Sequence, residues 1–121
     1  MKCPKDVLVE IMVSDPWEWG TELGVGPFTA TIVEWELHDD GQAKAILLVF
    51  ANTVEFEGVE CRYFVGSPRF VGAHLEDIMQ GKKVECCLTR IPEDRFRSPD
   101  PFDLSWWRGG VGLTCTIRRK K

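Results

Sequence analysis

Residues 28–50, FTATIVEWELHDDGQAKAILLVF, decide the fold. The second part of this stretch, AKAILLVF at 43–50, is the most continuously apolar run in the chain, with β-branched or long aliphatic residues at nearly every position. Such a run is typical of a strand that is covered on both faces. The sequence DDG at 39–41 supplies residues that tolerate a positive φ, as a tight reversal requires. We therefore predict a β-hairpin whose second arm lies at the centre of a sheet or in a barrel wall.

In the first arm of this hairpin, 28–38, apolar and polar residues tend to alternate, as they do in a strand with one buried and one polar face. Strict alternation places Val33 and Trp35 on one face and Ile32 and Glu34 on the other. We expect the polar side of this arm to face solvent in its second half.

Further strand patterns lie on both sides of the hairpin. The segment 54–65 reads as a second hairpin that turns at Glu57 and Gly58, and single strands are expected at 6–13, 82–91 and 111–117. Residues 74–81 have apolar positions at helical spacing and a glycine stop, and 15–24 has the cap and stop signals of one or two helical turns. We predict a mainly β chain folded as a single compact antiparallel β-barrel or strongly curled sheet, OB-like or another small barrel, with about six or seven strands and one or two short helices.

Length and composition favour one domain over residues 1–121. At 121 residues, 44% hydrophobic and 28% charged, the chain is long enough for one core and has the composition of ordinary globular proteins. No signal peptide or transmembrane span is recognisable, so we expect a cytoplasmic protein with no membrane partner.

The cysteines indicate neither a disulfide framework nor a metal site. Their number is odd, they include no CxxC pair, and the chain has only two histidines. We expect free, mostly buried thiols and no metal or cofactor; the cysteines are Cys3, Cys61, Cys86, Cys87 and Cys115.

Charge is distributed unevenly along the chain. Residues 1–60 hold 12 acidic and 3 basic side chains, whereas residues 61–121 hold 7 acidic and 12 basic ones. Four of those cations form a basic C-terminal tail at 118–121. In a barrel, strands from both halves share one wall, so we expect the asymmetry to cancel largely in space and the tail to be a solvated surface.

The irregular segment 92–110 is the first candidate for a binding site. Long loops without regular structure are disproportionately functional in small domains, and this one interleaves cations with aromatic rings. A tryptophan in the irregular segment 14–27 adds a ring of the same kind, and we predict that the two segments form a single site at one end of the barrel. Its residues would be Trp17, Arg95, Arg97, Trp106, Trp107 and Arg108. The alternative is that the loop folds its rings onto the barrel as a structural lid.

No catalytic motif is present. The chain has no GxSxG elbow and no phosphate-binding glycine loop that opens a helix. Glu34 and Glu36 are two apart on one strand, as acid/base pairs can be, and His38 and His74 have no recognisable local motif. The enzyme question therefore stays open and leans to no.

We predict a protein-interaction, inhibitor or adaptor module that uses the aromatic-rich loop, with a protein partner or self-association. The alternative is binding of single-stranded nucleic acid or an anionic small ligand on a small barrel. A second alternative is a hydrolase with an unrecognised carboxylate or Cys/His site.

Overall fold

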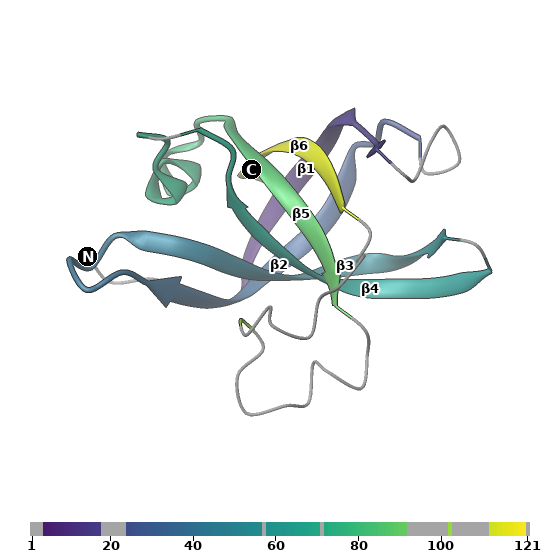
Figure 1. Ribbon diagram of the computed structural model, residues 1–121, viewed down its shortest axis with the longest axis horizontal. Helices are drawn as coiled ribbons and strands as arrows, with labels where there is room; N and C mark the ends of the chain where they lie inside the picture. The colour runs from purple at the N-terminus through teal and green to yellow at the C-terminus, as the bar shows by residue number, and fades with distance from the viewer. Residues whose placement is uncertain are drawn as a thin grey trace.

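A computed structural model describes residues 4–17, 24–56, 58–70, 72–91, 102 and 112–120. Its described strands form a closed antiparallel barrel in which each strand pairs with its neighbours in sequence and the last pairs with the first (Figure 1). The strands are β1 (Val7–Asp15), β2 (Phe28–Leu37), β3 (Ala43–Phe56), β4 (Val59–Pro68), β5 (Val84–Ile91) and β6 (Gly112–Arg119), and a 3-10 helix, η2 (Leu75–Gln80), precedes β5. The predicted β-barrel is confirmed. Because the strand order is sequential, it is an up-and-down barrel rather than the five-stranded Greek-key arrangement of an OB-fold.

Strand β3 is buried on both faces around Leu47, within the run 43–50 for which the sequence predicts it. Ile46 and Leu48 are fully buried in the barrel interior, while Leu47 is only 3% exposed on the outer side. The outer neighbours of Leu47 are Ala45, Val65 and Ile91, which form a second, smaller apolar cluster on the barrel wall. A run without alternation is therefore explained by two separate cores, one inside the barrel and one outside it.

The predicted faces of β2 are wrong in the middle of the strand. Ile32 pairs with Leu48 and Glu34 pairs with Leu47, so β2 has one extra residue, Val33, at this point. A bulge of this kind reverses which side chains point inward. As a result, Ile32 and Trp35 both lie in the interior cluster, and Val33 packs on the outer one.

Apolar side chains fill the barrel interior. The ring of Phe50 lies 4.5 Å from that of Phe64 and 5.8 Å from that of Phe28, measured between centroids. Barrels need about eight strands before a small ligand fits inside, so side-chain packing is what a six-stranded barrel accommodates. Candidate functional sites in this fold are therefore those on the surface and not in the lumen.

Helix η2 closes one end of the barrel. Leu75 and Ile78 are fully buried in the interior cluster, and Gly81 ends the helix with a φ of 84°. This confirms the helix predicted at 74–81, with 3-10 rather than α geometry. Most of the other predicted helical segment, 18–23, lies outside the described residues.

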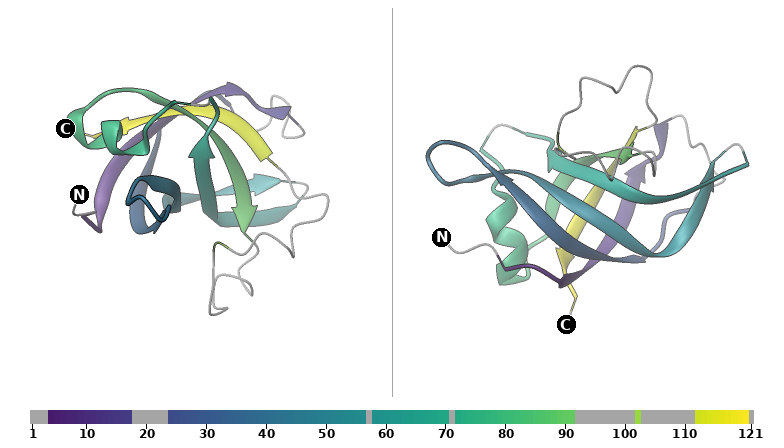
Figure 2. Two further views of the ribbon diagram at one scale, coloured as in Figure 1. Left: turned by 60° about the vertical axis from the view of Figure 1, so that its left-hand side comes forward. Right: turned by 90° about the horizontal axis from the view of Figure 1, so that it is seen from below.

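In the up-and-down order, successive connections between strands lie alternately at one end of the barrel and at the other. We call the end with η2 and the β2–β3 turn the helix end; β1 begins and β6 finishes there (Figure 2). The opposite end, where β1 connects to β2, β3 to β4 and β5 to β6, we call the loop end. Both segments of the predicted site, 14–27 and 92–110, thus connect strands at the loop end.

In the described residues, no helix is both long enough and apolar enough to cross a membrane.

Candidate functional site

Trp17 is the only residue of the predicted site that lies within the described part of the chain. It is 47% exposed, and its backbone has a φ of 48°. A methyl group built on Gly112 would lie 3.2 Å from the Trp17 ring, so the ring lies against the first residue of β6. This places Trp17 beside the strand that follows the 92–110 loop. The other five, Arg95, Arg97, Trp106, Trp107 and Arg108, lie outside the described residues, so the shared site stays a prediction.

Phe102 shows what one residue of the 92–110 loop contacts. It packs on the outer apolar cluster, as Tyr63 and Val33 do. Leu47 and Ile91 in that cluster are nearly inaccessible to solvent. At this residue the loop therefore has a packing role, which is what the lid alternative expects.

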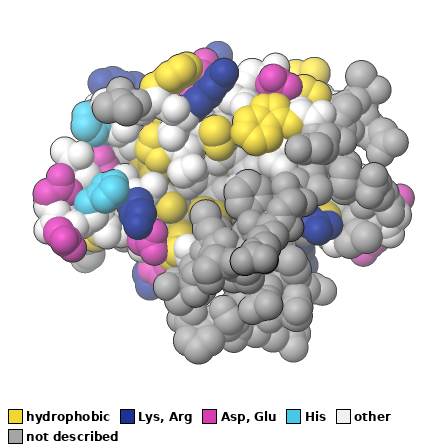
Figure 3. Space-filling view, in the orientation of Figure 1, with side chains coloured by type: hydrophobic (Ala, Val, Ile, Leu, Met, Phe, Trp, Pro, Cys, Tyr) yellow, Lys and Arg dark blue, Asp and Glu magenta, His cyan; other side chains and the backbone are white. Residues whose placement is uncertain are grey.

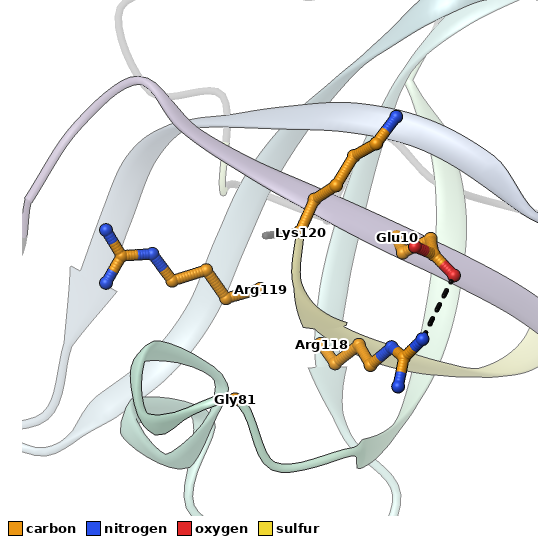
Figure 4. A pocket seen from close by; sticks show the side chains of 5 residues that line it. All are labelled: Glu10, Gly81, Arg118, Arg119 and Lys120. Carbon is orange, nitrogen blue, oxygen red and sulfur yellow. Dashed lines mark hydrogen bonds and ion pairs between the residues drawn. The ribbon is translucent and has the colours of Figure 1, made fainter.

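A second candidate site, which we call the basic cleft, lies on the surface at the helix end. A hollow of about 260 Å³ is lined by Glu10 of β1, Gly81 after η2, and the three consecutive cations that end and follow β6 (Figure 4). A neighbouring hollow of about 200 Å³ adds Lys83, and another of about 420 Å³ adds Met79 and Gln80. The hollows share lining residues and form one surface, whose cations are Lys83, Arg118, Arg119 and Lys120.

Strand pairing explains why the cations gather there. Arg118 and Arg119 are the last residues of β6 and pair with Glu10 and Val9 of β1. The backbone N–H of Lys120 continues the ladder by donating to the carbonyl of Leu8 at 2.9 Å. Three residues of the predicted basic tail are thus held against the barrel wall by β1.

The charge of the cleft is only partly neutralised. Arg118 forms an ion pair with Glu10, with 3.4 Å between nitrogen and oxygen, and the Lys120 ammonium donates to Thr29 Oγ1 at 3.0 Å. In Figure 4 the Arg119 side chain extends away from Glu10 on the side of η2. Within the described part of the chain, neither the Arg119 nor the Lys83 side chain has a hydrogen-bond or ion-pair partner. Among the described residues, the cleft therefore combines four cations with one carboxylate.

Acidic side chains gather on the β2–β3 hairpin at the same end. Glu34 and Glu36 form ion pairs with Lys5 and Lys44, at 3.1 and 3.6 Å. In Figure 3 acidic side chains cluster with histidine at the left edge of the molecule, where this hairpin ends in Figure 1. Asp39, in the exposed turn, has no such partner among the described residues. The expected cancellation of charge is therefore incomplete at the helix end.

Helix η2 lies between the acidic turn and the basic cleft. A Glu76 carboxylate oxygen accepts a hydrogen bond from the backbone N–H of Ala43, the first residue of β3. At its other end η2 runs into Gly81, which lines the cleft. The two regions of opposite charge are thus neighbours on one end of the molecule but do not neutralise each other.

Cys86 and Cys115 are poor candidates for nucleophiles. Cys86 of β5 and Cys115 of β6 lie opposite each other in the strand register. Both are fully buried, and neither forms a disulfide. Burial, with smaller effects from Cys87 and Glu85, raises the pKa of Cys86 to about 12. Burial likewise raises the pKa of Cys115. Both thiols therefore stay protonated at neutral pH, the unreactive form.

The remaining cysteines and the potential metal ligands also bear on the predictions from the sequence. Cys61 is buried and Cys87 half-buried, whereas Cys3 lies outside the described residues. Over the ranges that the structure describes, no group of three or more potential ligand side chains is close enough to hold a metal ion.

Sequence reasoning missed the basic cleft because its parts are far apart in the chain. The terminal cations were visible in the sequence, but Glu10 and Arg118 are 108 residues apart. The strand pairing that brings them together is not encoded in any local pattern.

We found no matching protein family, no similar curated protein and no similar solved structure.

Proposed function

We propose that this protein is an interaction domain whose basic cleft receives a short acidic segment of a protein partner. The observation that carries the proposal is a pair of uncompensated cations, Arg119 and Lys83, which line the two neighbouring hollows that share the Arg118–Glu10 ion pair. A carboxylate from a partner would supply the neutralising charge, and a guanidinium is suited to binding it with two parallel hydrogen bonds.

An acidic protein segment fits the cleft better than a nucleic acid does. The chain has a formal net charge of −4, and the exposed Asp39 carboxylate lies in the β2–β3 turn at the same end of the barrel. A long polyanion would extend from the cleft toward that negative surface, whereas a short segment would not. None of the described residues that line the cleft is aromatic, so they offer no ring on which bases could stack. Met12 and Met79 supply apolar contact area instead.

The expected affinity is modest and depends on salt. Arg118 is 46% exposed, so the cleft is solvated and each ion pair with a partner is worth at most about 1 kcal/mol. Three or four such pairs give a dissociation constant on the order of a millimolar. Raising the ionic strength should weaken binding, because exposed charges are screened.

Fluorescence anisotropy tests this proposal with two labelled probes of equal charge, a decapeptide of Glu and Asp and a single-stranded deoxythymidine oligonucleotide. We expect the peptide to bind the parent more tightly than the oligonucleotide, and Arg119→Glu to raise the dissociation constant of the peptide about tenfold. The matched control is the double variant Asn52→Glu, Thr53→Glu, which adds the same charge at exposed positions of β3 toward the loop end.

Two results would count against the acidic-segment proposal. If the control weakened peptide binding as much as Arg119→Glu, net charge and not the cleft would govern binding. If the oligonucleotide bound more tightly than the peptide, the partner class would be nucleic acid.

The exposed ring of Trp17 favours a second candidate function, binding of a protein partner at the loop end through the aromatic-rich loop. Tryptophan and arginine are the residues most often found as interface anchors. Acrylamide quenching of Trp106→Phe and Trp107→Phe variants tests this. Loss of a readily quenched signal in either variant supports an uncovered aromatic surface. Shielding of both rings would identify the loop as a structural lid.

A further inference from the structure

The β2–β3 turn and the basic cleft have complementary chemistry and lie on the same end of one molecule. We infer that the acidic segment bound by the cleft is the β2–β3 turn of a second copy of this chain. This inference rests on the proposed function, because it names the partner of the same site. Two copies would then form a two-fold dimer through their helix ends.

Each side of the proposed contact offers an unpaired charge of opposite sign. Asp39 in the turn is exposed and unpaired, and Arg119 in the cleft is unpaired as well, with respect to all residues that the structure describes. Helix η2, which contacts both β3 and β6, keeps them apart within one molecule. In a two-fold dimer the turn of each copy meets the cleft of the other, so a single kind of contact is made twice.

Exposed apolar side chains accompany both charged regions. Leu37, directly before the turn, is 45% exposed, and Leu8, whose carbonyl accepts the hydrogen bond of Lys120, is 51% exposed. Phe70, in the connection that leads to η2, is 56% exposed. Apolar area beside charged groups is what an interface between proteins requires, and a site for a small anion does not need it.

The turn is built to enter a cleft without much loss of conformational freedom. Its backbone is closed by hydrogen bonds from His38 N–H to the Gln42 carbonyl at 2.8 Å and from Gly41 N–H to the His38 carbonyl at 2.9 Å. The Asp40 carboxylate accepts a further bond from Gln42 N–H at 2.9 Å. The hairpin projects to one side of the barrel in Figure 1. A rigid projecting turn orders few groups on binding, which favours association.

Reversing single charges tests the dimer by sedimentation velocity at low salt. Asp39→Lys makes the turn of a copy basic, and Arg119→Glu makes its cleft acidic. Neither side chain has a partner in the described fold, so both variants should fold like the parent. We expect each variant alone to raise the dimer dissociation constant about a hundredfold, because a tenfold loss per contact occurs twice.

An equimolar mixture of the two variants is the sharpest arm of the experiment. In a mixed pair, the acidic turn of the Arg119→Glu copy meets a basic cleft, and the basic turn of the Asp39→Lys copy meets an acidic cleft. Dimers should therefore form again in the mixture. The control for Asp39→Lys is Glu55→Lys, an equal charge change at an exposed position of the β3 arm, and it should leave the dimer intact.

Three outcomes would overturn the dimer. They are a parent that stays monomeric up to millimolar concentration, a mixture that fails to reassociate, and a Glu55→Lys variant that dissociates as readily as Asp39→Lys. Binding of the acidic decapeptide to a monomeric parent, with loss in Arg119→Glu, would reject the dimer and leave the proposed function standing. Failure of both experiments would reject both.

Discussion

Gly66 is the position at which a single methyl group tests the packing of the barrel interior. It lies in β4 between Ile46 of β3 and Leu88 of β5. A Cβ at this position would stand 3.1 Å from Leu88 Cδ2 and 3.2 Å from Ile46 Cγ1, closer than carbon atoms normally approach. Overpacking of this kind costs about 1–3 kcal/mol, and replacing a strand glycine regains about 0.5–1 kcal/mol. We expect Gly66→Ala to lower the free energy of unfolding by about 1–2 kcal/mol.

A double-mutant cycle with Leu88→Ala assigns the loss to this contact. Leu88→Ala alone should cost about 2–5 kcal/mol because it leaves a cavity. In the double variant the methyl group added by Gly66→Ala has room, so the combined loss should be smaller than the sum by about 1 kcal/mol. Urea unfolding followed by tryptophan fluorescence measures all three variants. The control is Gly58→Ala in the open β3–β4 turn, where a φ of 79° penalises any side chain and coupling to Leu88 should be absent. Strict additivity of Gly66→Ala and Leu88→Ala would refute the packing we describe.

Other features of the fold lead to three further predictions. Above pH 9 the folded protein keeps Cys86 and Cys115 protonated, whereas the same thiols ionise in the unfolded chain. The stability that this protonation provides is complete below about pH 8.5. Between pH 9 and 11 the free energy of unfolding should therefore fall by about 1 kcal/mol per pH unit for each thiol. Urea titrations of Cys86→Ala, Cys115→Ala in reductant should show a flatter decline, and an unchanged slope would assign it to other groups. Gly112→Ala should displace the Trp17 ring and increase its quenching by acrylamide, measured as the difference from a Trp17→Phe background; identical quenching would show that the ring does not rest on β6. Leu47→Ala should cost about 2–5 kcal/mol in urea unfolding if the outer cluster is a true core, against less than about 0.5 kcal/mol for a solvent-facing residue.

The fold was predictable where local pattern and burial agree. The run AKAILLVF indicated a strand covered on both faces, and the structure has an apolar cluster on each face, one inside the barrel and one on its outer wall. The stop at Gly81 and the turn at Gly58 were also readable, because glycine at a positive φ leaves a local signature. In β2, by contrast, nothing in the sequence around Val33 marks the extra residue that reverses its faces. That bulge is fixed by the pairing with β3, which a local pattern does not contain.

The candidate site was less predictable than the fold, for the same physical reason. Arg118 and Arg119 look like part of a solvated tail in the sequence, and they become lining residues only because β6 pairs with β1. Trp17 was predicted to share a binding site with the aromatic-rich loop, and the residue is 47% exposed at the loop end. Its role in binding remains a prediction, because the five residues proposed to join it lie outside the described part of the chain.

The pairing of β1 with β6 also has a consequence for how the chain folds. Every other strand pair joins consecutive strands, whereas this one brings together residues as far apart as Glu10 and Arg118. Closing so long a loop costs about 2 kcal/mol more than closing a short hairpin, so we expect the hairpins to form first and the barrel to close last. Until closure, β1 and β6 are open edges of a curved sheet, and such edges pair with other chains. Refolding yield should therefore fall as protein concentration rises, even though the closed barrel has no such edge along these two strands.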